Sequence, residues 1–90
     1  MAKYYLEFST QAEADLKALK KSGTPAERKK IEKILCELET HPRTGTGNPE
    51  MLKYNFAGYW SRRLNKKDRL IYKIDDDKII VFILSSKGHY

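Results

Sequence analysis

A run of six apolar residues near the C-terminal end, Ile79-Ile-Val-Phe-Ile-Leu84, places the strongest constraint on the fold. A strand with one face in water would alternate apolar with polar residues, and this run does not. We therefore expect a central strand that is covered on both faces, at least partly by helices. Because the chain has only 90 residues, residues 1–90 are expected to form a single domain.

Two helix-start signals precede this strand. Thr10-Gln-Ala-Glu13 has the spacing of a capping box and predicts a helix that runs to about Ser22 and stops at Gly23. Thr24-Pro-Ala-Glu27 repeats the signal for a second helix, which Thr40-His-Pro42 ends. Each helix has an apolar stripe at helical spacing: Ala12, Leu16 and Leu19 in the first, and Ile31, Ile34, Leu35 and Leu38 in the second. The two antiparallel helices should pack as one layer against a sheet.

Strand-like segments make up most of the remainder. Lys3–Phe8 alternates, with Tyr4, Leu6 and Phe8 on one face and Tyr5 and Glu7 on the other. Four further segments are separated by turns short enough for successive hairpins: Met51–Tyr54, Tyr59–Leu64, Arg69–Ile74 and Lys78–Leu84. The prediction is an α+β fold of order β-α-α-β-β-β-β, in which two N-terminal helices pack on an antiparallel sheet of four to five strands.

The positive charge is concentrated in one stretch. Met51–Lys73 holds seven Lys and Arg residues against one acid, Asp68, so it carries +6, which equals the formal net charge of the whole chain. Four aromatic residues are interleaved with these charges: Tyr54, Phe56, Tyr59 and Trp60. This combination is typical of a surface that meets phosphates and stacks bases, so nucleic acid is the first expected partner. An acidic protein segment is the second, and an anionic membrane is a distant third.

Several functional classes are disfavoured. The single cysteine, Cys36, excludes an internal disulfide framework and suggests a reducing compartment. Neither a membrane-spanning apolar run nor a signal-peptide pattern is present, so we expect a cytoplasmic protein and no membrane partner. His41 and His89 are far apart and lack companions at ligand spacing, so we expect no zinc and no other cofactor.

The remaining reactive side chains would suit metal-free cleavage of RNA. In that reaction a base removes the proton of a 2′-hydroxyl, which attacks the adjacent phosphate, and an acid protonates the leaving 5′-oxygen. Glu50 can be the base, His89 can be the acid because the histidine pKa is about 6.5, and Arg69 can stabilise the charge that develops on the phosphate. Spacing alone does not show that these three residues converge.

Four motifs closely resemble the YoeB/Txe branch of the RelE-like bacterial toxins. They are Asn48-Pro-Glu50-x-Leu-Lys53, Gly58-Tyr-Trp-Ser-Arg-Arg-Leu64, Asp68-Arg-Leu-Ile-Tyr72 and the terminal His89-Tyr90. The resemblance is dense over about residues 41–90 and looser over the helices. It implies a RelE-like microbial RNase fold and a toxin of a type II toxin–antitoxin module. Toxins of this branch are ribosome-dependent endoribonucleases (mRNA interferases), which cut messenger RNA in the A site of the 70S ribosome and are held inactive by a Phd/YefM-type antitoxin.

The resemblance also implies roles for individual residues. Glu50, Arg69, His89 and Tyr90 fall on catalytic positions, and Lys53 and Arg63 on basic positions that bind the scissile phosphate. Arg62, Lys66 and Lys67 extend the candidate phosphate-binding set. The chain departs from the family at Tyr54, where a close relative has histidine, and before the terminal pair, where Ser-Ser-Lys-Gly replaces a segment with arginine and tyrosine.

Simpler interpretations stay open at each position. Glu50 could be an ordinary exposed acid, and the basic residues at 62, 63, 66 and 67 could be a solvated hairpin rim. Tyr5, Tyr54, Tyr59 and Trp60 are expected to pack in the core rather than stack on bases. The terminal His89 and Tyr90 could be a frayed chain end.

Two other functions compete with RNA cleavage. One is a non-catalytic basic module that binds RNA or the ribosome, and the other is a gyrase-directed toxin of the same superfamily. The gyrase-directed branch typically lacks this set of Glu, Arg and terminal His, which argues against it. The sequence leaves open whether the chain forms a homodimer.

Overall fold

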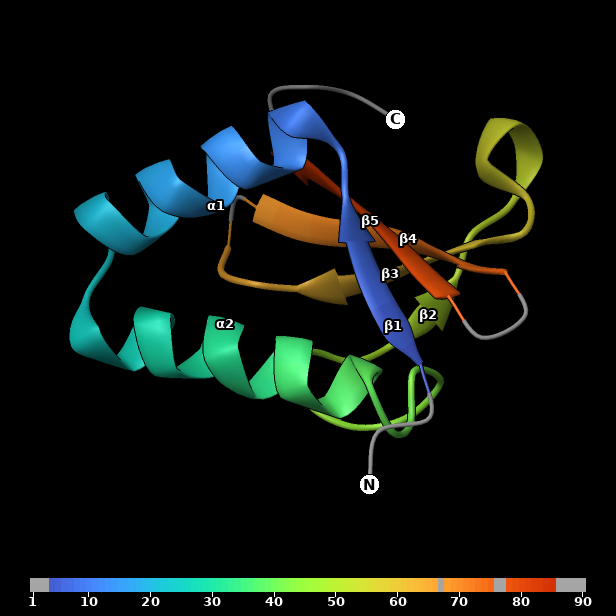
Figure 1. Ribbon diagram of the computed structural model, residues 1–90, viewed down its shortest axis with the longest axis horizontal. Helices are drawn as coiled ribbons and strands as arrows, with labels where there is room; N and C mark the ends of the chain where they lie inside the picture. Colours follow the sequence, from blue (N-terminus) through green and yellow to red (C-terminus); the bar gives the residue numbers. More distant parts are fainter. Residues whose placement is uncertain (1–3, 67, 76–77, 86–90) are drawn as a thin grey trace.

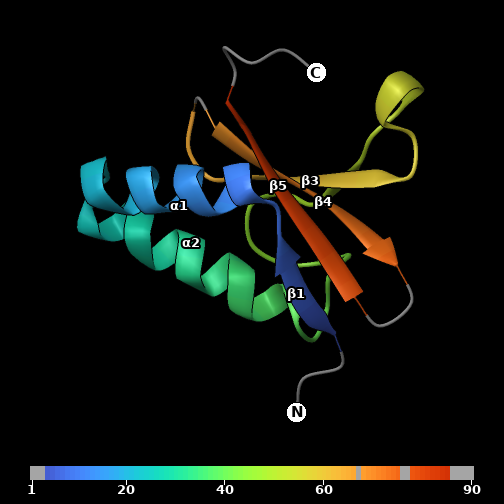
Figure 2. The same ribbon diagram turned by 45° about the horizontal axis from the view of Figure 1, so that its top comes forward.

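Two helices lie side by side on one side of a five-stranded sheet (Figures 1 and 2). The structure is a computed structural model that describes residues 4–66, 68–75 and 78–85, with residues 80–85 described by their backbone. Its elements follow the chain in this order: β1 (Tyr5–Phe8), α1 (Thr10–Ser22), α2 (Pro25–Leu38), β2 (Glu50–Met51), the 3-10 helix η1 (Tyr54–Phe56), β3 (Tyr59–Arg63), β4 (Asp68–Asp75) and β5 (Lys78–Ser85). The predicted α+β class and element order are confirmed.

The sheet is mixed, and its strand order is β1-β5-β4-β3-β2. Strands β2 to β5 form the predicted antiparallel meander, but β1 pairs in parallel with β5, so the prediction of a wholly antiparallel sheet is wrong at β1. The most apolar strand, β5, would be exposed along one edge if it closed the meander. Strand β1 covers that edge, and this makes β5 a central strand as predicted.

The helix ends follow local side-chain chemistry. The predicted capping box at Thr24 is present, because the Thr24 hydroxyl accepts from the Glu27 amide at 3.2 Å while the Glu27 carboxylate accepts from the Thr24 amide at 3.4 Å. The box predicted at Thr10 is wrong. Ser9 caps α1 instead, since its hydroxyl accepts from the Ala12 amide at 3.0 Å, and Thr10 is the first helical residue.

The hydrophobic core joins the predicted helix stripes to one face of the sheet. Its buried members are Ala12, Leu16, Ile31, Ile34, Leu38, Leu64, Leu70, Tyr72 and Ile79. Tyr4, Leu6 and Phe8 of the first strand pack against it from the same face, as their alternation predicts. Because side chains alternate along a strand, the intervening residues of β3 and β4 point away from the helices.

One predicted strand is mostly replaced by a turn. Only Glu50 and Met51 pair with β3, and the segment predicted as strand 51–54 continues into η1. The backbone of Tyr54 has a positive φ of 59°, a left-handed conformation outside the range of regular strand residues. Phe56 packs edge-on against Tyr59 with ring centroids 6.0 Å apart, which anchors η1 where it projects from the sheet away from the helices (Figure 1).

Candidate functional site

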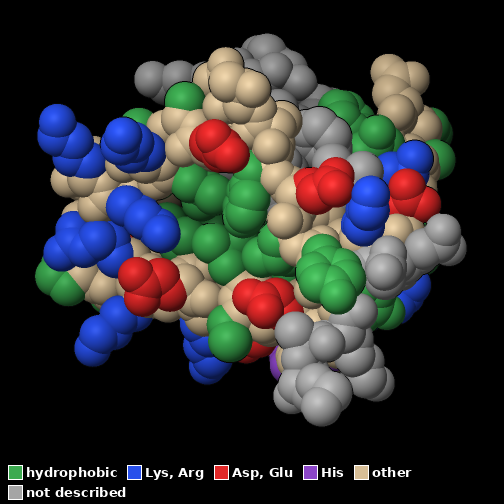
Figure 3. All heavy atoms as spheres, in the orientation of Figure 1, with side chains coloured by type: hydrophobic (Ala, Val, Ile, Leu, Met, Phe, Trp, Pro, Cys, Tyr) green, Lys and Arg blue, Asp and Glu red, His purple; other side chains and the backbone are tan. Residues whose placement is uncertain are grey.

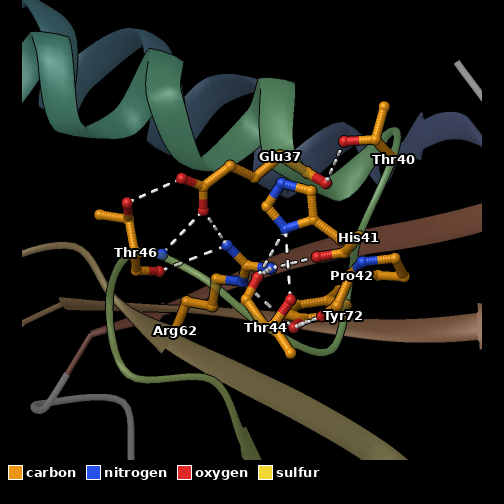
Figure 4. A network of polar contacts seen from close by, with 8 residues as sticks. All are labelled: Glu37, Thr40, His41, Pro42, Thr44, Thr46, Arg62 and Tyr72. Atoms are coloured by element: carbon orange, nitrogen blue, oxygen red, sulfur yellow. Dashed lines mark hydrogen bonds and ion pairs between the residues drawn. The ribbon is translucent and has the colours of Figure 1, made fainter. Parts of the chain in front are cut away.

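Arg62 lies inside the protein rather than on its surface. Its side chain is fully buried, and all five of its N–H donors have acceptors, as Figure 4 shows. Three of the acceptors are backbone carbonyls of the segment that follows α2: His41 at 2.9 Å, Thr44 at 2.8 Å and Thr46 at 3.3 Å. The other two are the Tyr72 hydroxyl at 3.3 Å and the Glu37 carboxylate at 2.6 Å. The prediction that Arg62 binds phosphate is therefore wrong, and so is the alternative of a solvated rim.

Glu37 is the partner that makes a buried guanidinium tolerable. Its other contacts are with Thr46, whose amide and hydroxyl both donate to the carboxylate at 2.8 Å. Burial by itself raises the pKa of Glu37, but the Thr46 hydrogen bonds and the charge of Arg62 outweigh it, so the pKa lies below its ordinary value. Glu37 therefore remains a carboxylate that holds Arg62 and Thr46 together.

Sequence reasoning missed Glu37. Its separation from Arg62 by 25 positions leaves no local pattern to read. The only signal is its place on α2, between the buried Ile34 and Leu38, where a charged side chain needs a partner.

Tyr72 completes this network from β4. Its hydroxyl accepts from Arg62 and donates to the carbonyl of Pro42, so it ties the sheet to the same segment. Burial raises the pKa of the Tyr72 phenol above its ordinary value, which keeps the donor proton in place. We call Glu37, Arg62 and Tyr72 the loop anchor, because together they hold the segment 41–47.

The opposite face of the sheet brings together three of the predicted site residues. Glu50 pairs with Ser61, and Arg63, two positions further along β3, pairs with Arg69 of β4. Directly opposite residues in an antiparallel ladder share a face, as do residues two apart on one strand. Glu50, Arg63 and Arg69 therefore lie on the face that the helices do not cover, and we call them the acid–arginine face.

This face combines a carboxylate with two directly opposed cations. Because Arg63 and Arg69 lie directly opposite one another on the ladder, two guanidinium groups are placed where one anion could contact both. Ser61 lies between Glu50 and Ile71 in the ladder, and its buried hydroxyl has no hydrogen-bond partner within the described part of the chain. A carboxylate beside arginines can remove a proton near a phosphate that the arginines bind.

The other predicted basic residues are dispersed. Lys53 is exposed beyond the end of β2, at a shallow hollow of about 240 Å³ formed by residues 52–56. Lys66 is exposed in the β3–β4 turn, in a hollow whose other lining residues include the acids Glu27 and Asp68. Lys67, His89 and Tyr90 lie outside the described residues. The position of His89, the predicted general acid, therefore cannot be compared with that of Glu50.

The aromatic residues divide into two groups. Trp60 packs against the core, as the packing interpretation predicts, whereas Tyr59 lies on the sheet face away from the helices and is partly buried under Lys73. The same interpretation is wrong for Tyr5 and Tyr54, which are 71% and 92% exposed. Tyr54 stands next to Lys53 on η1, so an aromatic ring and a cation occur together on an exposed turn.

A second basic surface lies on the helices. Residues 17–33 hold seven Lys and Arg residues against two glutamates, a net charge of +5 that acidic segments elsewhere in the chain offset. Figure 3 shows Lys and Arg side chains gathered at the end of the helix pair where α1 turns into α2. Four of these lysines are exposed: Lys17, Lys21, Lys29 and Lys33. We call this group the helix-end patch.

The described ranges show neither a cluster of metal ligands nor a membrane-spanning helix. Residues 4–66, 68–75 and 78–85 contain no group of three His, Cys, Asp or Glu side chains that could hold a metal ion. Within the same ranges no helix is both long enough and apolar enough to cross a membrane.

Comparison with known proteins identifies the family. The model of the YoeB-like toxin of bacterial type II toxin–antitoxin systems matches residues 8–90. The toxin YoeB of Escherichia coli O6:H1 is 40% identical over 62 residues, which cover 69% of this chain and 71% of that toxin. The YoeB dimer from Staphylococcus aureus is similar in structure, with a TM-score of 0.75 and 37% identity over 89% of this chain and 92% of that one.

A second structure from the same organism is a heterotetrameric YoeB–YefM toxin–antitoxin complex, and this chain matches it with a TM-score of 0.73 and 37% identity over 89% of this chain and 92% of that one. The predicted resemblance is confirmed, and the chain belongs to the family of YoeB-like toxins of bacterial type II toxin–antitoxin systems.

Proposed function

We propose that this toxin is a ribosome-dependent endoribonuclease that cuts messenger RNA in the ribosomal A site and so inhibits translation. The observation that carries the proposal is the acid–arginine face, where Glu50 lies beside the opposed pair Arg63 and Arg69. Membership of the YoeB-like family supports it. The toxin would act in the cytoplasm, where translating ribosomes are.

In the proposed reaction Glu50 removes the proton of a 2′-hydroxyl, and the oxygen attacks the adjacent phosphorus. Arg69 and Arg63 stabilise the negative charge that develops on the phosphate oxygens. Lys53, which is exposed beyond the end of β2, supplies a further cation for the RNA backbone. His89 donates a proton to the leaving 5′-oxygen and Tyr90 orients the substrate, roles that the family resemblance implies. The products are a 2′,3′-cyclic phosphate and a free 5′-hydroxyl. Because side chains act as the base, the acid and the charge-stabilising groups, the proposed reaction uses no metal or other cofactor.

The proposed partners follow from charge and from the relatives. The helix-end patch provides a cationic surface on the helices, separate from the acid–arginine face of the sheet, and we assign it to the phosphates of ribosomal RNA. A Phd/YefM-type antitoxin would cover the basic stretch Met51–Lys73 with acidic residues, since complementary charge speeds association. The YoeB dimer and the YoeB–YefM heterotetramer of Staphylococcus aureus support a homodimer and an antitoxin complex here.

The decisive experiment maps cut sites in translating and non-translating messages after the chain is induced. We expect cuts confined to ribosome-bound codons, and we expect Glu50→Ala and His89→Ala to abolish them while ribosome binding is retained. Each role contributes on the order of 10²-fold or more to the rate. Ribosome binding without any cleavage by the unaltered chain would instead favour a non-catalytic binding module. Continued protein synthesis on induction would refute the proposal.

A further inference from the structure

We propose that Arg62 and Glu37 are positioning residues that place Glu50 on the acid–arginine face through the loop anchor. The inference rests on the role proposed for Glu50. Neither side chain lies on that face, because Arg62 is fully buried and points to the opposite side of β3, where it contacts Glu37.

The first step is the way in which the segment after α2 is held. Residues 41–47 form neither helix nor strand, so their backbone groups need partners from elsewhere. Arg62 binds three of the carbonyls, Glu37 binds the Thr46 amide and hydroxyl, and Tyr72 binds the carbonyl of Pro42 (Figure 4). The path of the segment is thus set by the anchor rather than by its own secondary structure.

The second step is the close fit between this segment and the anchor. Gly45 and Gly47 have positive φ values of 121° and 87°, and a Cβ added at Gly45 would collide with the Glu37 carboxylate. At Gly47 a Cβ would lie 2.9 Å from the carbonyl oxygen of Arg63 and 3.1 Å from Ile34. The segment therefore has little room to shift while the anchor is intact.

The third step links the anchor to Glu50. The carbonyl of Gly47 accepts from the Arg63 amide at 2.7 Å, and three residues later Glu50 begins β2 opposite Ser61. Beyond Glu50, the Leu52 amide donates to the carbonyl of Tyr59 at 2.8 Å. Glu50 is thus held between two backbone hydrogen bonds to β3. The first of them, from the Arg63 amide to the Gly47 carbonyl, forms only if the loop anchor holds Gly47 in its observed position.

The test uses Thr46→Val, which removes one hydroxyl–carboxylate bond of the anchor, and Glu37→Gln, which removes its charge. Thr24→Val is the matched control, because it also removes a hydroxyl–carboxylate bond, at the remote start of α2. We expect the single-turnover cleavage rate of ribosome-bound message to fall about 10- to 100-fold in the two anchor variants, as expected for a catalytic group displaced by about 1 Å. The half-saturating toxin concentration should change less than about twofold, because ribosome binding does not use the anchor. Thr24→Val should keep the unaltered rate.

Amide hydrogen exchange supplies a readout that does not depend on catalysis. In the anchor variants the amides of Arg63 and Leu52, on either side of Glu50, should exchange faster by about tenfold or more beyond any general loss of stability, which the core amides of β4 report. Unchanged exchange at both amides, or faster exchange with an unchanged cleavage rate, would overturn the inference. If the unaltered chain cleaves nothing, the proposed function fails, and the exchange of these two amides still decides whether the anchor places Glu50.

Discussion

The carboxylate of Glu37 lies 2.6 Å from the guanidinium of Arg62, although 25 positions separate the two residues in the chain. Arg62 is fully buried and the Glu37 side chain is only 14% exposed, so removing either partner leaves a charge largely withdrawn from water. We expect Glu37→Ala to lower the free energy of unfolding by about 3–5 kcal/mol in urea titrations. Glu32→Ala, an exposed glutamate of the same helix, should change it by less than about 0.5 kcal/mol. A small effect of Glu37→Ala would mean that water reaches the buried guanidinium.

Acid should weaken the fold partly through Glu37. Its pKa in the folded chain lies below the ordinary value of 4.5, so at neutral pH the ionised carboxylate stabilises the folded state. As the pH falls below about 4.5, the unfolded chain binds this proton before the folded chain does, and the contribution is lost as the pH passes through the folded pKa. We expect Glu37→Gln to flatten the dependence of unfolding free energy on pH below about 5, whereas Glu32→Gln should leave it as steep as before.

Gly45 offers a test of the fit between the loop and the anchor. Gly45 and Gly58 both have strongly positive φ, 121° and 93°, so alanine at either position strains the backbone and lowers the free energy of unfolding. Only at Gly45 would the added Cβ collide with Glu37, since nothing lies within 4 Å of it at Gly58. We expect Gly45→Ala to lower the unfolding free energy by about 1–3 kcal/mol more than Gly58→Ala does. Equal losses would show that the segment moves aside at little cost.

The sequence predicts the fold well where the signal is local or periodic. The helix stripes, the capping box at Thr24 and the antiparallel meander are all found. The parallel pairing of β1 with β5 was missed, because alternation reveals which residues share a face but not which strand lies alongside. The strand predicted at 51–54 is wrong beyond Met51, because Tyr54 adopts a left-handed backbone conformation that its residue type does not signal.

The site shows the same limit at the level of side chains. Arg62 and Arg63 are adjacent and chemically identical, yet one anchors a loop in the interior and the other lies on the open face. Alternation along β3 does predict that they point in opposite directions, but choosing the buried one requires Glu37, which approaches from a helix. Motif resemblance treats both as basic residues near a phosphate. Only the packed structure separates them.

The two basic surfaces should separate binding from chemistry. If the helix-end patch contacts ribosomal RNA, Lys21→Ala and Lys29→Ala should each weaken ribosome binding and lower the slope of log affinity against log salt by about 0.7–0.9. The single-turnover rate on saturated ribosomes should not change, because the acid–arginine face is intact. Arg63→Ala should instead lower that rate by about 10²-fold. A lower single-turnover rate in the lysine variants would show that the helix-end patch and the acid–arginine face act as one functional site.

Tyr54 provides the last test, since its ring is 92% exposed on a backbone with positive φ. Exposed rings beside a cation are suited to stacking on an unpaired base, and such stacking contributes about 1–3 kcal/mol per base. We expect Tyr54→Ala to weaken the binding of toxin to message-programmed ribosomes by roughly 5- to 150-fold, which is that free energy expressed as affinity. Tyr5→Ala removes another exposed tyrosine, from the edge strand β1, and should leave affinity unchanged. Tyr54→Phe keeps the ring and should bind like the unaltered chain; if it weakens binding as much as alanine does, the contact is made by the hydroxyl and stacking is excluded.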